Sequence, residues 1–359
     1  MKYIDEYRDK EIVKKLLAEI RKISRKDIAL MEVCGGHTMS IQKFGIPSLL
    51  PSNIRLLSGP GCPVCVSHRG FIDRAIAFSR IPDTIITTFG DLIRVPGSTS
   101  SLDNEKASGA DIRIVYSILD ALDIARRNPD KKVIFPGIGF ETTAPGTAAG
   151  ILTASREKIH NFYVYSSHKI MPPAMEALID EGVKINGYIA PGHVTAITGP
   201  EIYQSIPEKF GLGVVVSGFE PVDLLKAIYM LVKQFERAKP SVEIAYTRAV
   251  KAGGNQKAKD MLDEVFVRRD DWWRGLGMIP GSGLGISGKY EAFDAEEQIE
   301  VEVEPTREDK GCICGEILKG LKTPKECKLF GKVCTPNNPV GTCMVSNEGS
   351  CHAFYRYNR

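Results

Sequence analysis

The cysteines of this chain are its most informative residues, because of their number and their spacing. Three of the nine lie at positions 34, 62 and 65, residues 66–311 contain none, and the other six fall between 312 and 351. In a reducing compartment, clustered thiols serve metal binding or redox exchange more often than structural disulfides. The distribution therefore predicts two separate sites with metal or redox chemistry.

The first pattern is Cys34-Gly-Gly-His37, which offers a thiolate and an imidazole three residues apart. Soft sulfur and imidazole ligands suit a thiophilic transition metal such as iron, and the two glycines let a ligand approach the backbone closely. A tight turn with a buried cysteine and a hydrogen-bonded histidine is the alternative. The residues alone leave both interpretations open.

The second pattern, Cys62-Pro-Val-Cys65, lies just before a helix expected to begin near Gly70. A thiol near a helix N-terminus has a lowered pKa, and CxxC spacing lets two sulfurs form a disulfide or share a metal. A zinc half-site is disfavoured because no second CxxC is present to complete it. The pattern favours a redox dithiol over an iron ligand.

The C-terminal tail carries the most specific signal. Its six cysteines are Cys312, Cys314, Cys327, Cys334, Cys343 and Cys351. This density exceeds what core packing requires. Four thiolates can hold a [4Fe–4S] cluster at widely varying spacing, whereas structural zinc usually has paired CxxC knuckles, which this tail lacks. The tail therefore predicts a [4Fe–4S] cluster, with structural zinc as the alternative.

Other polar residues follow predicted strands. Glu141 could place a carboxylate on a polar ligand, while either of the two threonines after it could cap a helix starting at Pro145. Both interpretations can hold together. His193, in Pro-Gly-His-Val, and His168 are lone histidines, which are more often structural than ligands.

The elements that position these residues form a regular series. Apolar, β-branched runs occur at 27–33, 53–58, 83–89, 132–138, 161–167, 187–191 and 213–218, and helical patterns follow several of them. Strands that alternate with helices and are apolar on both faces predict parallel sheets of the α/β class. Ligands bind beyond the carboxyl ends of such strands, so the loops named above should converge on one cleft.

Chain length and the alternation of predicted strands and helices predict three domains. Two similar parallel-sheet βαβ domains, 1–130 and 131–240, should face each other across the cleft, and 241–359 should form a third, Cys-rich iron–sulfur domain. In the third domain the pattern predicts a helix over 257–273, a Gly-rich turn segment over 277–290 and a strand over 298–304.

Composition excludes some classes of function. The net charge of +3 arises from 47 basic and 44 acidic residues, which gives no electrostatic case for nucleic acid or an anionic membrane. No apolar run reaches the roughly 18 residues of a membrane span. Residues 1–22 predict a charged amphipathic helix without the apolar stretch of a signal peptide. The chain is therefore expected to be cytoplasmic.

Several motifs together resemble one family, the HypD hydrogenase maturation factors. They read CGGHT (34–38), GPGCPVC (59–65), TTFGD (87–91) with VPGS (95–98), GFETT (139–143), PGHV (191–194), GFEPVDLL (218–225) and CMVSNEGSC (343–351). The resemblance covers about 31–357. It implies three α/β-containing domains, the first two similar and facing across a cleft, and the third carrying a [4Fe–4S] cluster.

The resemblance also implies partners and roles. A HypC-type chaperone would share an Fe(II) ion with Cys34, beside His37, and a HypE-type protein would supply the cyanide that joins CO on that iron. Cys62 and Cys65 would relay electrons between the cluster and the iron. The candidate catalytic residues are then Cys34, His37, Cys62, Cys65, Glu141 and His193. No independent turnover reaction can be assigned.

Cluster ligation by this resemblance falls on Cys327, Cys334 and Cys351 with Cys312 or Cys314, Cys312 being preferred, and Cys343 is spare. Two other classes of function compete. An iron–sulfur thiol–disulfide reductase of the ferredoxin–thioredoxin type would leave the Cys34 pattern without a task. A zinc-tailed binding module would leave the CxxC pair unexplained.

Overall fold

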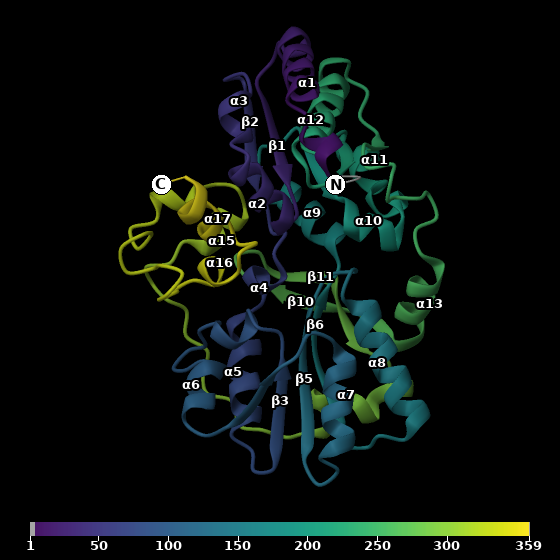
Figure 1. Ribbon diagram of the computed structural model, residues 1–359, viewed down its shortest axis with the longest axis vertical. Helices are drawn as coiled ribbons and strands as arrows, with labels where there is room; N and C mark the ends of the chain where they lie inside the picture. Colours follow the sequence, from purple (N-terminus) through teal and green to yellow (C-terminus); the bar gives the residue numbers. More distant parts are fainter. Residues whose placement is uncertain (1–3, 359) are drawn as a thin grey trace.

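The computed structural model describes residues 4–358 and contains two β-sheets, one in each half of the molecule (Figure 1). The first sheet is entirely parallel, with the strand order β2-β1-β7-β8-β9. Its strands are β1 (Ile28–Glu32), β2 (Ile54–Ser58), β7 (Gly187–Pro191), β8 (Gly213–Ser217) and β9 (Val242–Ile244). β1, β7 and β8 are buried along their whole length, as expected for a parallel sheet covered on both faces.

The second sheet has the order β10-β11-β6-β5-β3-β4. Its strands are β3 (Thr84–Thr88), β4 (Asp111–Ile114), β5 (Lys132–Gly139), β6 (Phe162–Lys169), β10 (Phe266–Trp273) and β11 (Gly277–Ile286). β3 to β6 are parallel, and the antiparallel pair β10–β11 extends this sheet beyond β6. The α/β class with parallel sheets is confirmed.

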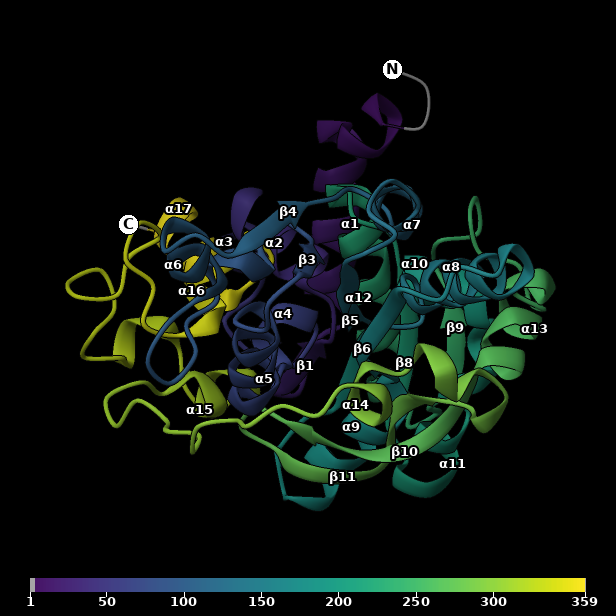
Figure 2. The same cartoon turned by 90° about the horizontal axis from the view of Figure 1, so that it is seen from below.

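Helices cover the sheets and form the tail (Figure 1, Figure 2). They are α1 (Lys10–Ile23), α2 (Gly35–Lys43), α3 (Ile46–Leu49), α4 (Pro63–Val66), α5 (Arg69–Ser79), α6 (Leu102–Ala107), α7 (Ile118–Arg127), α8 (Ala144–Glu157), α9 (Met171–Asp180), α10 (Gly192–Thr198), α11 (Ser205–Phe210), α12 (Pro221–Glu236), α13 (Gln256–Val265), α14 (Ala295–Gln298), α15 (Cys314–Leu318), α16 (Thr342–Val345) and α17 (Ser350–Tyr357). The N-terminal helix expected over 1–22 corresponds to α1, which begins at Lys10 and is capped by the Asp9 side chain. Residues 1–3 of that prediction lie outside the described residues.

Three groups of buried side chains hold these layers together. One lies between the first sheet and helices α1 and α12, and another between the second sheet and helices α7, α8 and α13. The third and largest is continuous between the sheets and the tail, and includes Met31 of β1, Ile134 of β5, Tyr188 of β7 and Met344 of α16. The cysteine-rich tail is therefore part of the common core. It lies on the opposite side of the molecule from α13 (Figure 1, Figure 2).

The chain passes between the two sheets more than once. β1 and β2 are followed by four strands of the second sheet, and the chain then returns to add β7, β8 and β9 to the first. The predicted boundary between residues 130 and 131 therefore does not coincide with the division between the sheets. Hydrophobic periodicity identifies strands but does not say which sheet each strand joins.

Three predictions for the C-terminal third were wrong. The helix expected over 257–273 ends at Val265 and continues as β10, and the Gly-rich segment 277–290 is largely β11. The glycines allow this pairing, because a Cβ at Gly283 would collide with the side chain of Asp271 across the ladder. Residues 298–304 alternate in polarity but form no strand.

No helix among residues 4–358 is both long enough and apolar enough to cross a membrane.

A buried ion pair connects β6 to β10, the edge strand on the far side of β11. The Lys169 side chain is 2% exposed; its Nζ lies 2.8 Å from Asp271 Oδ2 and donates to the Trp272 carbonyl at 2.9 Å. Asp271→Ala would leave a buried ammonium without its counter-charge, which typically costs about 3–5 kcal/mol. We expect a loss of this order in the free energy of unfolding, measured by urea denaturation.

The control is Glu11→Ala, which breaks the surface pair between Glu11 and Lys14. Exposed pairs contribute little, so stability should hardly change. An equally small effect for Asp271→Ala would contradict the structural role of the buried pair.

Candidate metal and redox centre

The candidate centre lies at the topological switch point of the first sheet, between β1 and β7. From β1 the chain adds β2 on one side, and it later adds β7 on the other. The loops after β1 and β7 separate at this switch point, where open α/β sheets bind ligands. Cys34 follows β1 and His193 follows β7, and Cys34 Sγ lies 4.0 Å from His193 Nδ1. Two residues that are 159 positions apart thus meet as the sequence predicted for convergent loops.

Cys34 is held at the N-terminus of α2 by backbone contacts. Its N–H donates to Glu32 Oε2 at 3.0 Å, and the N–H of Gly35 donates to the Gly61 carbonyl at 2.9 Å. Position 61 must be glycine, because any Cβ there would overlap the Cys34 backbone. Burial raises the pKa of the Cys34 thiol, so a neighbouring cation or metal would be needed to stabilise its thiolate.

His37 and His193 flank one aromatic ring. The Phe219 ring centroid lies 4.9 Å from that of His37 and 5.2 Å from that of His193. His37 Nε2 donates to the Gly218 carbonyl at 3.0 Å, which leaves Nδ1 as an acceptor, and this buried atom has no partner among residues 4–358. Burial lowers the pKa of His37 to about 3 and that of His193 to about 4, so both imidazoles are neutral near pH 7.

Glu32 is a site residue that the sequence analysis missed. Its buried carboxylate accepts hydrogen bonds from the Cys34 N–H, from Ser58 Oγ at 2.5 Å and from the Thr38 hydroxyl. Burial raises the pKa of Glu32 to about 8, against the effect of these hydrogen bonds. The available signal was an acidic residue inside the otherwise apolar run 28–33. Glu32, the last residue of β1, orients the Cys34 loop through its hydrogen bond with the Cys34 N–H.

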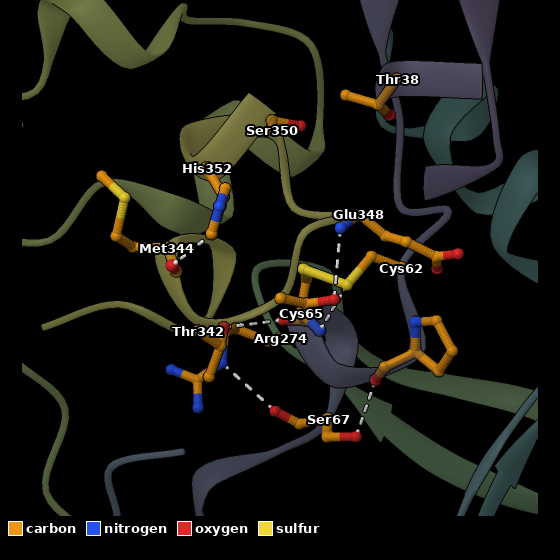
Figure 3. Close-up of a disulfide and its surroundings, with 12 residues drawn as sticks. Thr38, Cys62, Cys65, Ser67, Arg274, Thr342, Met344, Glu348, Ser350 and His352 are labelled. Carbon is orange, nitrogen blue, oxygen red and sulfur yellow. Dashed lines mark hydrogen bonds between the residues drawn. A yellow bond between two sulfur atoms is a disulfide. The ribbon is translucent and has the colours of Figure 1, made fainter. Parts of the chain in front are cut away.

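Cys62 and Cys65 form a disulfide, with their Cα atoms 5.2 Å apart (Figure 3). Cys62 caps α4, a four-residue helix that was not predicted, and the expected helix near Gly70 is α5. The pair lies next to the metal candidate, because Gly61, the residue before Cys62, packs on Cys34. On the other side, Thr342 Oγ1 donates to the Cys65 carbonyl at 3.1 Å.

The tail brings most of its cysteines together. Cys312 Sγ lies 3.1 Å from Cys314 Sγ, and the Cys351 thiol also bonds to Cys314, which with burial raises the pKa of Cys351. Burial first, and then the charges of Cys314 and Cys312, raise the pKa of Cys334. Gly341 leaves room for this group, since a Cβ there would collide with the sulfurs of Cys312 and Cys314.

The other two tail cysteines differ. Cys343 is fully buried close to Cys351. Within residues 4–358 no contact joins the Cys327 thiol to the other sulfurs, although a tight turn connects Cys327 to Cys334 through Phe330. No three His, Cys, Asp or Glu side chains in this range converge to hold a single metal ion.

The tail also contacts the Cys34 loop directly. Glu348 packs so closely on Gly35 that no Cβ could fit there, and Ser350 Oγ donates to Ser58 Oγ at 2.9 Å. Burial and then the charge of Asp91, in the loop after β3, raise the pKa of Glu348. The loops after β1, β2, β3, β7 and β8 and the tail thus meet around Cys34.

Glu141 and His168 lie elsewhere. Glu141 Oε1 accepts from the N–H of Met171, the first residue of α9, whereas the buried Oε2 has no partner among residues 4–358. Glu141 lines a pocket of about 560 Å³, and the buried Tyr203 lies near both its charge and that of Cys34. The threonine cap was wrong, because Thr143 precedes α8 without capping it by its side chain. His168 is structural, bonded to Thr147 and Ser166.

Comparison with known proteins agrees with this geometry. The HypD family model, described as "Hydrogenase formation hypA family", matches residues 11–358. The chain belongs to the HypD family. The hydrogenase maturation factor HypD2 of Bradyrhizobium diazoefficiens is 46% identical over 100% of this chain and 97% of its own length. HypD of Azotobacter vinelandii is 45% identical over the same shares, and HypD of Cupriavidus necator is 44% identical over 100% and 98%.

Membership in the HypD family makes the chain a hydrogenase maturation factor, as the sequence resemblance implied. The HypD match includes every loop that meets around Cys34 and the whole cysteine tail.

Glu141 allows a pH-dependent test. Burial raises its pKa from 4.5 to about 7, so the folded state favours the protonated carboxyl. The stability that protonated Glu141 contributes is fully present below about pH 4.5 and is lost as the pH rises through about 7. The free energy of unfolding should fall by on the order of 3 kcal/mol, because one pKa unit corresponds to about 1.36 kcal/mol. Glu141→Gln cannot ionise and should remove this decline when unfolding is measured at pH 4.5 and 8.

Glu176→Gln is the matched control, because Glu176 lines the same pocket but is partly exposed and paired with Lys209. It should leave the pH difference of the wild type in place. A Glu141→Gln variant with the same pH profile as the wild type would show that Glu141 is ionised in the folded protein.

Proposed function

We propose that this protein is a scaffold on which, together with a HypC-type chaperone, the Fe(II) fragment of a [NiFe]-hydrogenase receives its cyanide and CO ligands. Cys34 would bind the iron jointly with a cysteine of the chaperone, and a HypE-type protein would donate the cyanide. Low-spin iron with these ligands prefers soft donors, which a thiolate supplies. A cytoplasmic location belongs to the proposal, since free thiols persist in reducing compartments.

The observation that carries the proposal is the serial contact of three sulfur sites. The Cys34 backbone touches Gly61, the next residue begins the Cys62–Cys65 disulfide, and the Cys65 carbonyl binds Thr342. Thr342 in turn follows Gly341, which lies against two tail sulfurs. A thiol–disulfide reductase would need the second and third sites but not Cys34 with its neighbouring His193.

The donors in the tail fit a [4Fe–4S] cluster. All six of its cysteines are free thiols, four of them lie together, and glycine at 341 leaves space beside their sulfurs. Each cluster ligand binds a different iron atom, so the thiolates need not converge on one point. We propose three ligands from this group, Cys334, Cys351 and one of Cys312 and Cys314. The fourth proposed ligand is Cys327, which a tight turn connects to Cys334.

When bound, such a cluster supplies electrons one at a time. Residues of this chain would then store these electrons and hold the Cys34 loop in position. The Cys62–Cys65 disulfide takes up two electrons and two protons, its S–S bond breaks and two thiols form. In its reduced form the thiol pair would lie beside the Cys34 site as a donor of two electrons and two protons. Glu32 and His37 hold the Cys34 loop in position and exclude water from it.

The tail assignment predicts a brown protein after anaerobic purification, with about four irons and four sulfides per chain. Cys334→Ser and Cys351→Ser should lose the iron and the colour, because each removes one thiolate ligand. Cys343→Ser, a matched change at a buried thiol outside the ligand set, should keep both. Separate Cys312→Ser and Cys314→Ser variants identify the fourth ligand. A colourless zinc protein would refute the cluster.

Cys34→Ser tests the iron site. The hydroxyl is a poor ligand for low-spin iron, so the complex with a HypC-type chaperone should lose the infrared bands of CN and CO bound to iron. The fold, the tail cluster and the Cys62–Cys65 thiol chemistry should remain. Cys343→Ser again serves as the control and should retain the bands. Unchanged bands in Cys34→Ser would mean that the iron is bound elsewhere.

A further inference from the structure

Arg274 is a buried cation attached to the end of the disulfide helix. It follows β10, is 7% exposed, and its N–H donates to the Val66 carbonyl at 2.9 Å. Its Nε donates to the Ser67 carbonyl at 3.2 Å, and Nη1 donates to Glu308 Oε2 at 3.0 Å. Figure 3 shows the Arg274 side chain beside Thr342 and the Cys62–Cys65 pair. The guanidinium is therefore fixed between α4 and the tail.

Gly275, the residue after Arg274, contacts the tail directly after Cys314. Gly275 packs on Gly315, the residue after Cys314, and a Cβ at either glycine would overlap the backbone of the other. Gly275 also has φ of +82°, which favours glycine. This close approach needs two positions without side chains. The backbone at 274–275 thus lies directly beside the backbone at 314–315.

One donor of Arg274 is unused. Nη2 is buried and has no hydrogen-bond partner among residues 4–358. A buried unpaired donor is costly, about 1–3 kcal/mol and more when it is charged. An anionic sulfur acceptor in the tail would satisfy this orphaned N–H.

We propose that Arg274 tunes the tail cluster, its Nη2–H and its positive charge stabilising the sulfur ligands and raising the cluster's reduction potential. This inference rests on the proposed function, which supplies the cluster. Hydrogen bonds to the sulfurs and nearby charge are two of the factors that set such potentials. A reduced cluster has one more negative charge than the oxidised one, so a fixed cation stabilises the reduced form. Arg274 touches no iron and is a positioning and tuning residue.

The test is a reductive titration of the full chain, monitored by electron paramagnetic resonance, for wild type, Arg274→Gln and Arg274→Lys. Gln removes the charge, so the potential should fall by the equivalent of a roughly tenfold change in the redox equilibrium constant, ~59 mV for one electron. Lys keeps the charge but loses the planar fork, so its shift should be smaller. Iron content is measured for each protein.

The control is Arg94→Gln, since Arg94 Nη2 also donates to the tail, at the Val345 carbonyl, but is largely exposed. Its potential should equal that of the wild type. Unchanged potentials in both Arg274 variants, with iron content intact, would overturn the inference and leave the proposed function standing. A wild type without an iron–sulfur signal would refute the cluster itself. If Arg274→Gln binds no iron, the Arg274→Lys variant provides the test. A reduction potential below that of the wild type supports the inference, and a potential equal to that of the wild type overturns it.

Discussion

The close approach of the loops after β1 and β2 is the constraint on which the rest of the centre depends. Gly61 lies on the Cys34 backbone, and the Gly35 N–H bonds to the Gly61 carbonyl, so the two loops form one unit. Because Cys62 follows Gly61 directly, this contact also fixes the disulfide beside Cys34. Glu348 then closes on Gly35 from the tail. A side chain at position 61 would separate Cys34 from the Cys62–Cys65 disulfide.

Burial gives these groups unusual acid–base properties. Glu32 and Glu141 have raised pKa values, and His37 and His193 have lowered ones, chiefly because the surrounding protein disfavours their charged forms. The result is a set of side chains that are mostly neutral near pH 7. The exception is Arg274, a permanent cation next to the tail.

The sequence predicted β1, β2, β3, β5, β6, β7 and β8, since apolar runs are local signals, but it missed the short edge strands β4 and β9. Sheet membership was not predictable from one sequence, because the return of β7 to β1 depends on contacts between residues 157 positions apart. β10 and β11 were missed since charged and glycine-rich segments disfavour strands unless a neighbour pairs with them. Glu32 and Arg274 act through burial and long-range contacts, which local patterns do not report.

The contact between Ser350 and Ser58 joins residues 292 positions apart in the chain. During synthesis at about 5–20 residues per second, the segment that covers the Cys34 loop emerges ~15–60 seconds after the loop itself. Throughout that interval the nascent chain exposes Cys34, Cys62 and Cys65 without Thr342, Glu348 or the tail cysteines beside them. Under the proposed function, iron bound to Cys34 in that interval would have no path for electrons from the tail. Iron loading would then follow release from the ribosome, after the tail has packed over the Cys34 loop.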